Sequence, residues 1–186
     1  MILLKKQVAA KVLVGVAVVG VAFSPVMASA ATDTTTVTAT VDSAISVSST
    51  GAVAISVNPA TNGGVGTGSD TVTVDSNDVD GYTLTINNDA TLTLDGDGET
   101  IAPTTGTLAS PAALDTNSWG FRVAALPAFA TAGTYAQVPS TAGTIRDTTA
   151  VASNEQTTVE YGVKVDVSQP NGAYSDTVTY TATVKP

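Results

Sequence analysis

The sequence predicts an all-β protein, an antiparallel β-sandwich of immunoglobulin-like or jelly-roll type, preceded by an amino-terminal signal peptide. Three observations carry this prediction: period-two alternation of apolar and polar residues, frequent glycine-containing turns, and 32 threonines among 186 residues. Threonine is β-branched and favours strands, while its hydroxyl tolerates water on the exposed face of a sheet. No convincing helical period follows the first thirty residues.

Alternation marks the expected strands in order along the chain. It is found at 36–41, 71–74, 82–86, 91–94, 159–167 and 174–184. Such alternation indicates strands with one buried and one exposed face, which is typical of antiparallel sheets. Turn signals such as Asp80-Gly81 and Asn171-Gly172 separate these stretches. In the last stretch the apolar face consists of Tyr174, Val178, Tyr180, Ala182 and Val184.

Two long segments, 102–117 and 124–154, break the alternation and are rich in Ala, Thr, Gly and Pro. Loops of this length are usually functional or disordered, and we expect flaps over a sheet edge with a short strand or two. Between them, Trp119 and Phe121 alternate with polar residues and point to the core together with Val123. Arg122 is then expected on the wet face, in a surface ion pair.

The amino end reads as a secretory signal. Lys5, Lys6 and Lys11 precede the uncharged run 12–23, and Ala28-Ser29-Ala30 forms a small-x-small cleavage site. This run is shorter than the ~20 residues of a membrane-spanning helix. We therefore expect a signal peptide at 1–30, a single mature domain at 31–186 without a membrane span, and a secreted, extracellular location at the cell surface.

Composition excludes several classes of function. The chain has no His and no Cys, so it cannot form a Ser-His-Asp triad, and zinc and haem sites lack their usual ligands. The mature chain keeps four basic residues against sixteen acidic ones, a net charge of −12, and has no basic patch for nucleic acid. We expect no enzyme activity, no catalytic residues, no bound cofactor and no nucleic-acid partner.

Acidic residues cluster in two turn-like segments. Asp95, Asp97 and Glu99 form one cluster, and Asp78 and Asp80 belong to the other. Carboxylate oxygens at these spacings are candidate calcium ligands, although neither cluster completes an EF-hand loop. Tight turns require the same residue types for backbone reasons. Both interpretations, a calcium site and plain turn chemistry, stay open.

The carboxyl-terminal segment 169–184, with its Gly172-x-Tyr174-x-Asp176-x-Val178 motif followed by alternating Thr and apolar residues, resembles the closing strand of secreted pilin-like β-sandwiches. Spore-coat-U-type proteins end in a similar way. The segment Thr34–Val41 after the signal is similar to their opening strand. The Thr-rich strands also resemble those of WxL-type cell-surface proteins. The resemblance implies a structural or adhesive surface protein and assigns no binding residues.

These features together predict a secreted, non-enzymatic structural protein of the cell surface, with assembly into a pilus or filament by β-strand addition as its mode of action. The segment Thr34–Val41 either pairs within its own domain or completes a neighbour's sheet, with Val37, Ala39 and Val41 filling pockets. The expected partners are further copies of the chain, or another surface protein or glycan. The alternative is a monomeric extracellular module that binds glycan or protein through the loops 102–117 and 124–154.

Overall fold

The computed structural model describes residues 30–61, 64–88, 92–94 and 98–186. The regular elements in these residues are β-strands and one short 3-10 turn, with no α-helix, and the prediction of an all-β protein is confirmed. The chain divides into two units, Met1–Ala39 and Thr40–Pro186. In the first unit residues 30–39 are exposed and form no strand. The expected signal peptide, including Ala28 of its cleavage site, lies outside the described residues except for the exposed Ala30.

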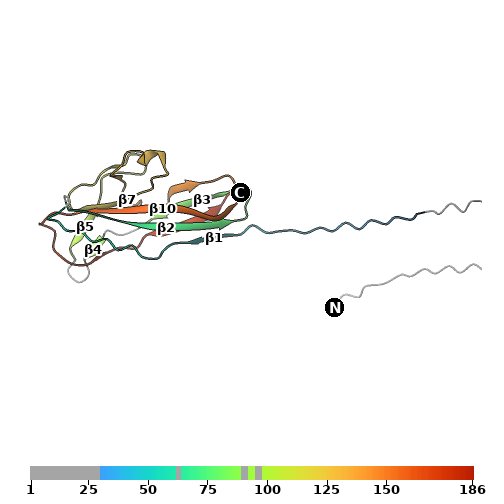
Figure 1. Ribbon diagram of the computed structural model, residues 1–186, viewed down its shortest axis with the longest axis horizontal. Helices are drawn as coiled ribbons and strands as arrows, with labels where there is room; N and C mark the ends of the chain where they lie inside the picture. Colours follow the sequence, from blue (N-terminus) through green and yellow to red (C-terminus); the bar gives the residue numbers. More distant parts are fainter. Residues whose placement is uncertain (1–29, 62–63, 89–91, 95–97) are drawn as a thin grey trace, which may run out of the picture. The chain divides into compact units, whose positions relative to one another are not determined.

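The larger sheet has the strand order β1-β2-β10-β7-β5-β4-β11. Its two longest strands, β2 and β10, run side by side and antiparallel through its middle (Figure 1). The strands are β1 (Ile45–Ser48), β2 (Val65–Ser76), β4 (Leu92–Leu94), β5 (Thr100–Pro103), β7 (Ser118–Arg122), β10 (Ala152–Lys164) and β11 (Tyr174–Ser175).

A second sheet has three strands in the order β12-β3-β9. They are β3 (Tyr82–Asn87), β9 (Gly143–Asp147) and β12 (Thr179–Val184), and both pairs are antiparallel. A small ladder joins β6 (Ala112–Ala113) to β8 (Thr134–Tyr135), and the short 3-10 turn η2 covers Pro127–Phe129.

The two sheets share one hydrophobic core. The alternation on β2 and β10 buries Val72, Val74 and Val159, and that on β3 buries Leu84 and Ile86, all at 0% exposure. Side chains from both sheets belong to the same cluster of buried residues. The apolar face of each sheet therefore packs against the other sheet, as expected for strands with one buried and one exposed face.

The larger sheet is mixed, so the prediction of purely antiparallel pairing is wrong at one place. β5 and β7 pair in parallel, with Ala102 opposite Ser118 and Pro103 opposite Trp119. A parallel pair needs a crossover connection of about a dozen or more residues. The segment between Pro103 and Ser118 supplies one, and it contains β6.

Three predicted strands differ from the observed ones. No strand forms at Thr34–Val41, and the first strand, β1, begins at Ile45 and pairs with the end of β2. The strand predicted at 159–167 corresponds to β10, which begins earlier, at Ala152, and ends at Lys164. The stretch 174–184 is interrupted at 176–178, so that β11 pairs with β4 and β12 with β3.

The long segments cover a face of the larger sheet as well as contributing strands. A Cβ on Gly162 of β10 would lie 2.6 Å from the ring of Tyr135 and 3.0 Å from Leu114. Both Glu160 and Lys164, on the same side of β10, are consequently half-buried rather than fully hydrated. Tyr135 donates a hydrogen bond to Glu160 at 2.8 Å, and Lys164 donates one to the carbonyl of Leu114 at 3.3 Å.

Candidate functional site

The amino-terminal segment Thr34–Val41 is exposed along its whole length and belongs to no strand. Its alternation leaves apolar side chains in water: Val37 is 88% exposed and Val41 82%. Extended residues with apolar side chains on one face are suited to adding to a sheet edge.

The chain that follows this segment is held in place from Asp42 onward. The Asn77 side chain accepts a hydrogen bond from the N–H of Ala44 at 2.7 Å and donates one to the carbonyl of Asp42 at 2.9 Å. Ser43 donates to Asp78 at 2.9 Å. These contacts fix the start of β1 on the turn between β2 and β3.

The outer edge of β12 has no strand partner among the described residues, since β12 pairs only with β3. The N–H of Lys185 donates to the carbonyl of Gly81 at 3.1 Å, immediately beyond the ladder. Because backbone groups alternate between the two edges of a strand, those of Tyr180, Ala182 and Val184 face away from β3. β1 lies close to β12, but no ladder joins them.

Burial is also incomplete under β12. The inward side chains of Tyr180, Ala182 and Val184 are half-buried, whereas those of the adjacent β3 are fully buried. β12 carries neither a charged residue nor a proline, and charges and prolines are the features that usually protect an edge strand from further pairing. Within the described residues, β12 therefore lacks the features that usually protect an edge strand.

A polar cluster links β12 to the larger sheet. The hydroxyls of Tyr180 and Tyr161 lie 2.6 Å apart. Burial raises the pKa of Tyr161 to about 12, and burial together with the neighbouring Tyr161 and Asp70 raises the pKa of Tyr180 well above its ordinary value. Asp70 is 5% exposed and accepts hydrogen bonds from the N–H and hydroxyl of Thr50 at 2.9 and 2.5 Å.

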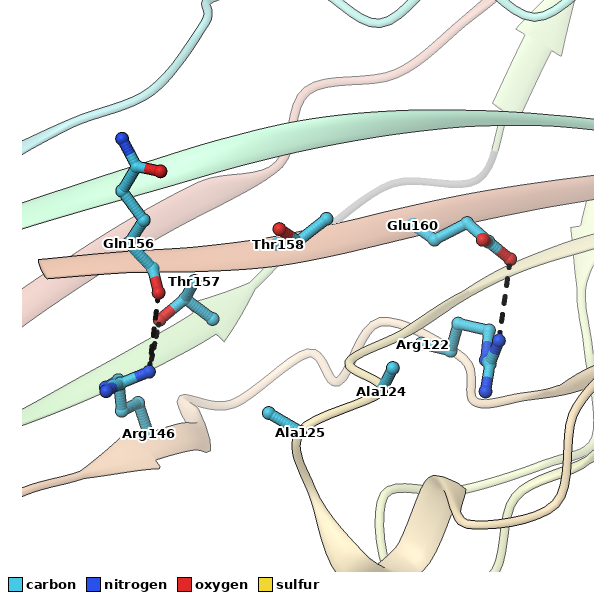
Figure 2. A pocket seen from close by; sticks show the side chains of 8 residues that line it. All are labelled: Arg122, Ala124, Ala125, Arg146, Gln156, Thr157, Thr158 and Glu160. Carbon is cyan, nitrogen blue, oxygen red and sulfur yellow. Dashed lines mark hydrogen bonds and ion pairs between the residues drawn. The ribbon is translucent and has the colours of Figure 1, made fainter.

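A hollow of about 300 Å³ lies between β10, β9 and the segment after β7. Figure 2 shows Arg146 at one end of it and Arg122 near the other, with Ala124 and Ala125 beside β10. The rest of the lining is polar and comes from β10: Gln156, Thr157, Thr158 and Glu160.

The second acidic segment takes part in turn contacts. Asp78 accepts a hydrogen bond from the N–H of Asp80 at 3.0 Å, and Asp75 accepts one from the N–H of Asn154 at 2.7 Å. Glu99 is exposed, while Asp95 and Asp97 lie outside the described residues. Within residues 30–61, 64–88, 92–94 and 98–186, no three acidic side chains gather in a way that could hold a metal ion.

The three apolar residues predicted to point to the core between the two long segments do so, whereas Arg122 is less exposed than expected. Trp119, Phe121 and Val123 are buried in the core, and Trp119 stacks on Tyr161 with ring centroids 6.5 Å apart. Arg122 forms the expected ion pair, at 4.0 Å from Glu160, although its side chain is only 15% exposed. The covering segment accounts for this lower exposure.

The hollow was not predicted from the sequence. Its two arginines belong to different sheets, and Arg146 lies inside a segment without alternation. The one sequence signal that points to it is the scarcity of basic residues: residues 31–186 contain four, so two arginines that line the same hollow are unusual.

No helix in the part of the chain that the structure describes is long and apolar enough to cross a membrane. In comparisons with known proteins, no protein-family model, no curated protein and no solved structure matches this chain.

Proposed function

We propose that this chain is a secreted, non-enzymatic structural protein of the cell surface, a β-sandwich whose copies join into filaments or pili by β-strand addition. The observation that carries the proposal is the exposed segment Thr34–Val41, with apolar residues on one face and no strand of its own. The signal-like residues 1–30 support export, and the lack of His and Cys supports a non-catalytic role.

The donor in this assembly is Thr34–Val41. Added to a sheet edge, its backbone supplies hydrogen bonds along the ladder, while Val37, Ala39 and Val41 pack into the neighbouring copy. Burial of one valine side chain contributes about 1.5–3 kcal/mol. The threonines between them face water, where their hydroxyls remain hydrated.

The acceptor in this assembly is the outer edge of β12. The backbone groups of Tyr180, Ala182 and Val184 are directed to that edge, and their side chains are half-buried. A strand added there forms hydrogen bonds with these backbone groups and completes the burial of these side chains. Because both strands are free of charge, no desolvated ion opposes the pairing.

Size-exclusion chromatography and electron microscopy of the mature protein, residues 31–186, test the proposal. Deletion of residues 31–41 is expected to abolish polymers. Val37→Asp with Val41→Asp is expected to do the same, because it buries two carboxylates. Thr36→Asp with Thr40→Asp is the matched control: it adds the same charge on the opposite face of the segment and is expected to leave assembly nearly intact.

A synthetic peptide of residues 31–41 provides a second readout. In excess it is expected to bind the truncated protein and to shorten polymers of the mature protein, because it occupies the acceptor edge. Polymers formed by the truncated protein, or equal effects of the two aspartate pairs, would show that strand addition by this segment is wrong.

The alternative function is a monomeric module that binds glycan or protein through the segments 102–117 and 124–154. The hollow bordered by Ala124 and Ala125 favours it. A mature protein that remains a monomer at all concentrations, together with ligand binding that tolerates deletion of residues 31–41, selects this function over assembly.

A further inference from the structure

The connection between β10 and β11 carries an Asn-Gly pair in an exposed turn. Asn171, Gly172 and Ala173 are all exposed, and none of them belongs to a strand. Among the described residues, no hydrogen bond involves the Asn171 side chain or the N–H of Gly172. No contact within the described domain therefore keeps the side-chain amide of Asn171 from the main-chain nitrogen that follows it.

The turn is fixed on both sides of this pair. The hydroxyl of Tyr174 donates a hydrogen bond to the carbonyl of Pro170 at 2.8 Å, and the Gln169 side chain donates to that hydroxyl at 2.7 Å. Gln169 also donates to the carbonyl of Thr100 at 3.1 Å. Because these contacts hold the two ends of the turn, a chemical change at Asn171 acts directly on the connection to β11.

Asparagine is followed by glycine at no other place in the described residues, and the pair at 62–63 lies outside them. The side chains of Asn77 and Asn117 are in addition held by hydrogen bonds. Asn154 is exposed, but the residue after it is Glu155, whose Cβ restricts the approach of its nitrogen. Asn171 therefore combines an exposed amide with an unobstructed neighbour.

We propose that Asn171 is a site of non-enzymatic deamidation, in which the main-chain nitrogen of Gly172 attacks the Asn171 side chain to form a cyclic imide. Glycine favours this attack because it has no Cβ to obstruct a close approach. The reaction is intramolecular, so proximity lowers its barrier, and asparagine is among the residues that limit the lifetime of proteins when heated. The proposal concerns the domain itself and does not depend on assembly through residues 31–41.

The atoms balance with water as the only co-reactant. As the bond from the Gly172 nitrogen to the Asn171 Cγ forms, the bond from Cγ to Nδ2 breaks, and the amide proton leaves with Nδ2 as ammonia. Water then opens one of the two C–N bonds of the imide. Opening at Cγ gives aspartate, and opening at the main-chain carbonyl gives isoaspartate, which has one more carbon atom in its main chain.

Isoaspartate at this position is expected to loosen the attachment of β11. The inserted carbon lengthens the backbone between Pro170 and Tyr174, whose hydrogen bond spans the turn. β11 pairs with β4 only through Tyr174 opposite Leu94 and Ser175 opposite Thr93. A pairing this short has few hydrogen bonds with which to resist local opening. Each product also adds one negative charge to a chain that is already acidic.

Peptide mapping of the mature protein, aged at mildly alkaline pH in water enriched in ¹⁸O, tests the proposal. Trypsin releases the peptide 165–186, because Lys185 precedes a proline, and Asn171 is the single asparagine in it. We expect Asn171 to lose ammonia and to gain one labelled oxygen, in both aspartate and isoaspartate forms. Digestion in ordinary water leaves any conversion that occurs during the digest unlabelled.

The neighbouring tryptic peptide, 147–164, contains Asn154 as its single asparagine and provides the internal control. Gly172→Ala is expected to slow the conversion of Asn171 about tenfold or more, which corresponds to a barrier raised by about 1.4 kcal/mol. Ala173→Gly is the matched control, since it alters the same turn but keeps the Asn-Gly pair, and it should leave the rate nearly unchanged.

Asn171→Asp separates the two consequences of the reaction, because it adds the charge without lengthening the main chain. Hydrogen exchange at Tyr174 and Ser175 is expected to accelerate in the aged protein and to stay unchanged in freshly prepared Asn171→Asp. Equal acceleration in both proteins would overturn the role of the lengthened main chain.

The proposed site itself is overturned by any of three results. The first is that Asn171 stays intact in the protein while a synthetic peptide of residues 168–175 converts under the same conditions. The second is that Asn154 converts as fast as Asn171. The third is that Gly172→Ala leaves the rate of conversion unchanged. None of these results bears on assembly through residues 31–41, so the two proposals fail separately.

Discussion

The hydroxyl oxygens of Tyr161 and Tyr180 lie 2.6 Å apart and join β10 to β12. Tyr161 belongs to the larger sheet and Tyr180 to the three-stranded one, so this hydrogen bond connects the two sheets at β12, whose outer edge has no strand partner in the part of the chain that the structure describes. It fixes the position of β12, and with it the edge that we propose as the acceptor of a neighbour's strand.

Removal of either hydroxyl is expected to destabilise the domain. Tyr161→Phe and Tyr180→Phe each leave one buried hydroxyl with a lost partner, and each should lower the free energy of unfolding by about 1–3 kcal/mol. The double variant should cost less than the sum of the two, because the pair is removed together. Urea unfolding of the four proteins measures this coupling, and strictly additive effects would contradict it.

Alkaline pH is expected to destabilise the domain between about pH 10 and 12. The pKa values of Tyr82, Tyr135 and Tyr161 are raised to about 12, in each case mainly by burial, with hydrogen bonds to Glu155 and Glu160 adding to it for the first two. The unfolded chain loses these protons near pH 10 while the folded chain retains them. Stability is therefore present in full below this window and falls as the pH rises through it.

The absorbance of phenolate during a pH titration checks this prediction. Ionisation of the three buried tyrosines should coincide with loss of the circular dichroism of the sheets. Tyr82→Phe provides the control, since it should reduce the slope of unfolding free energy against pH in this window. Ionisation of all tyrosines near pH 10 in a fully folded protein would contradict the burial of these hydroxyls.

Gly162→Ala tests the covering of β10 by the long segments. The added Cβ would lie 2.6 Å from the ring of Tyr135, and overpacking of this kind costs about 1–3 kcal/mol. In a Tyr135→Ala background the same substitution should cost much less, because the ring is gone. Melting curves of the two single variants and the double variant measure the difference, and an equal cost in both backgrounds would show that Tyr135 does not cover Gly162.

Alternation predicted the strands whose burial pattern repeats locally. Tyr82–Ile86 and the segment 71–74 alternate without interruption, and both lie in strands with fully buried apolar faces. The beginning of β10 was missed, because Ser153, Asn154 and Gln156 are exposed and give no apolar period. Its pairing with β2 over the whole strand supplies what the local pattern lacks.

The sites depend on contacts that no local pattern contains. The partners of Arg122 and Arg146 include Glu160 and Glu155, which lie on β10, while the arginines come from β7 and β9. The sequence allows a surface ion pair to be predicted for Arg122, but it does not show that Arg122 and Arg146 line the same hollow. For Thr34–Val41 the alternation predicted a strand, but the segment forms none within its own chain. Its pairing with another copy stays a prediction.

Asn77→Ala is expected to release the start of β1. It removes the hydrogen bonds to Asp42 and Ala44 and should lower the free energy of unfolding by about 1–3 kcal/mol. Hydrogen exchange should accelerate in residues 42–48 before it does in β2 or β10, because only the amino-terminal contacts are lost. Asn171→Ala, at another exposed turn, is the matched control and should leave this exchange unchanged. Faster exchange throughout the domain would instead mean that Asn77 stabilises the turn between β2 and β3 as a whole.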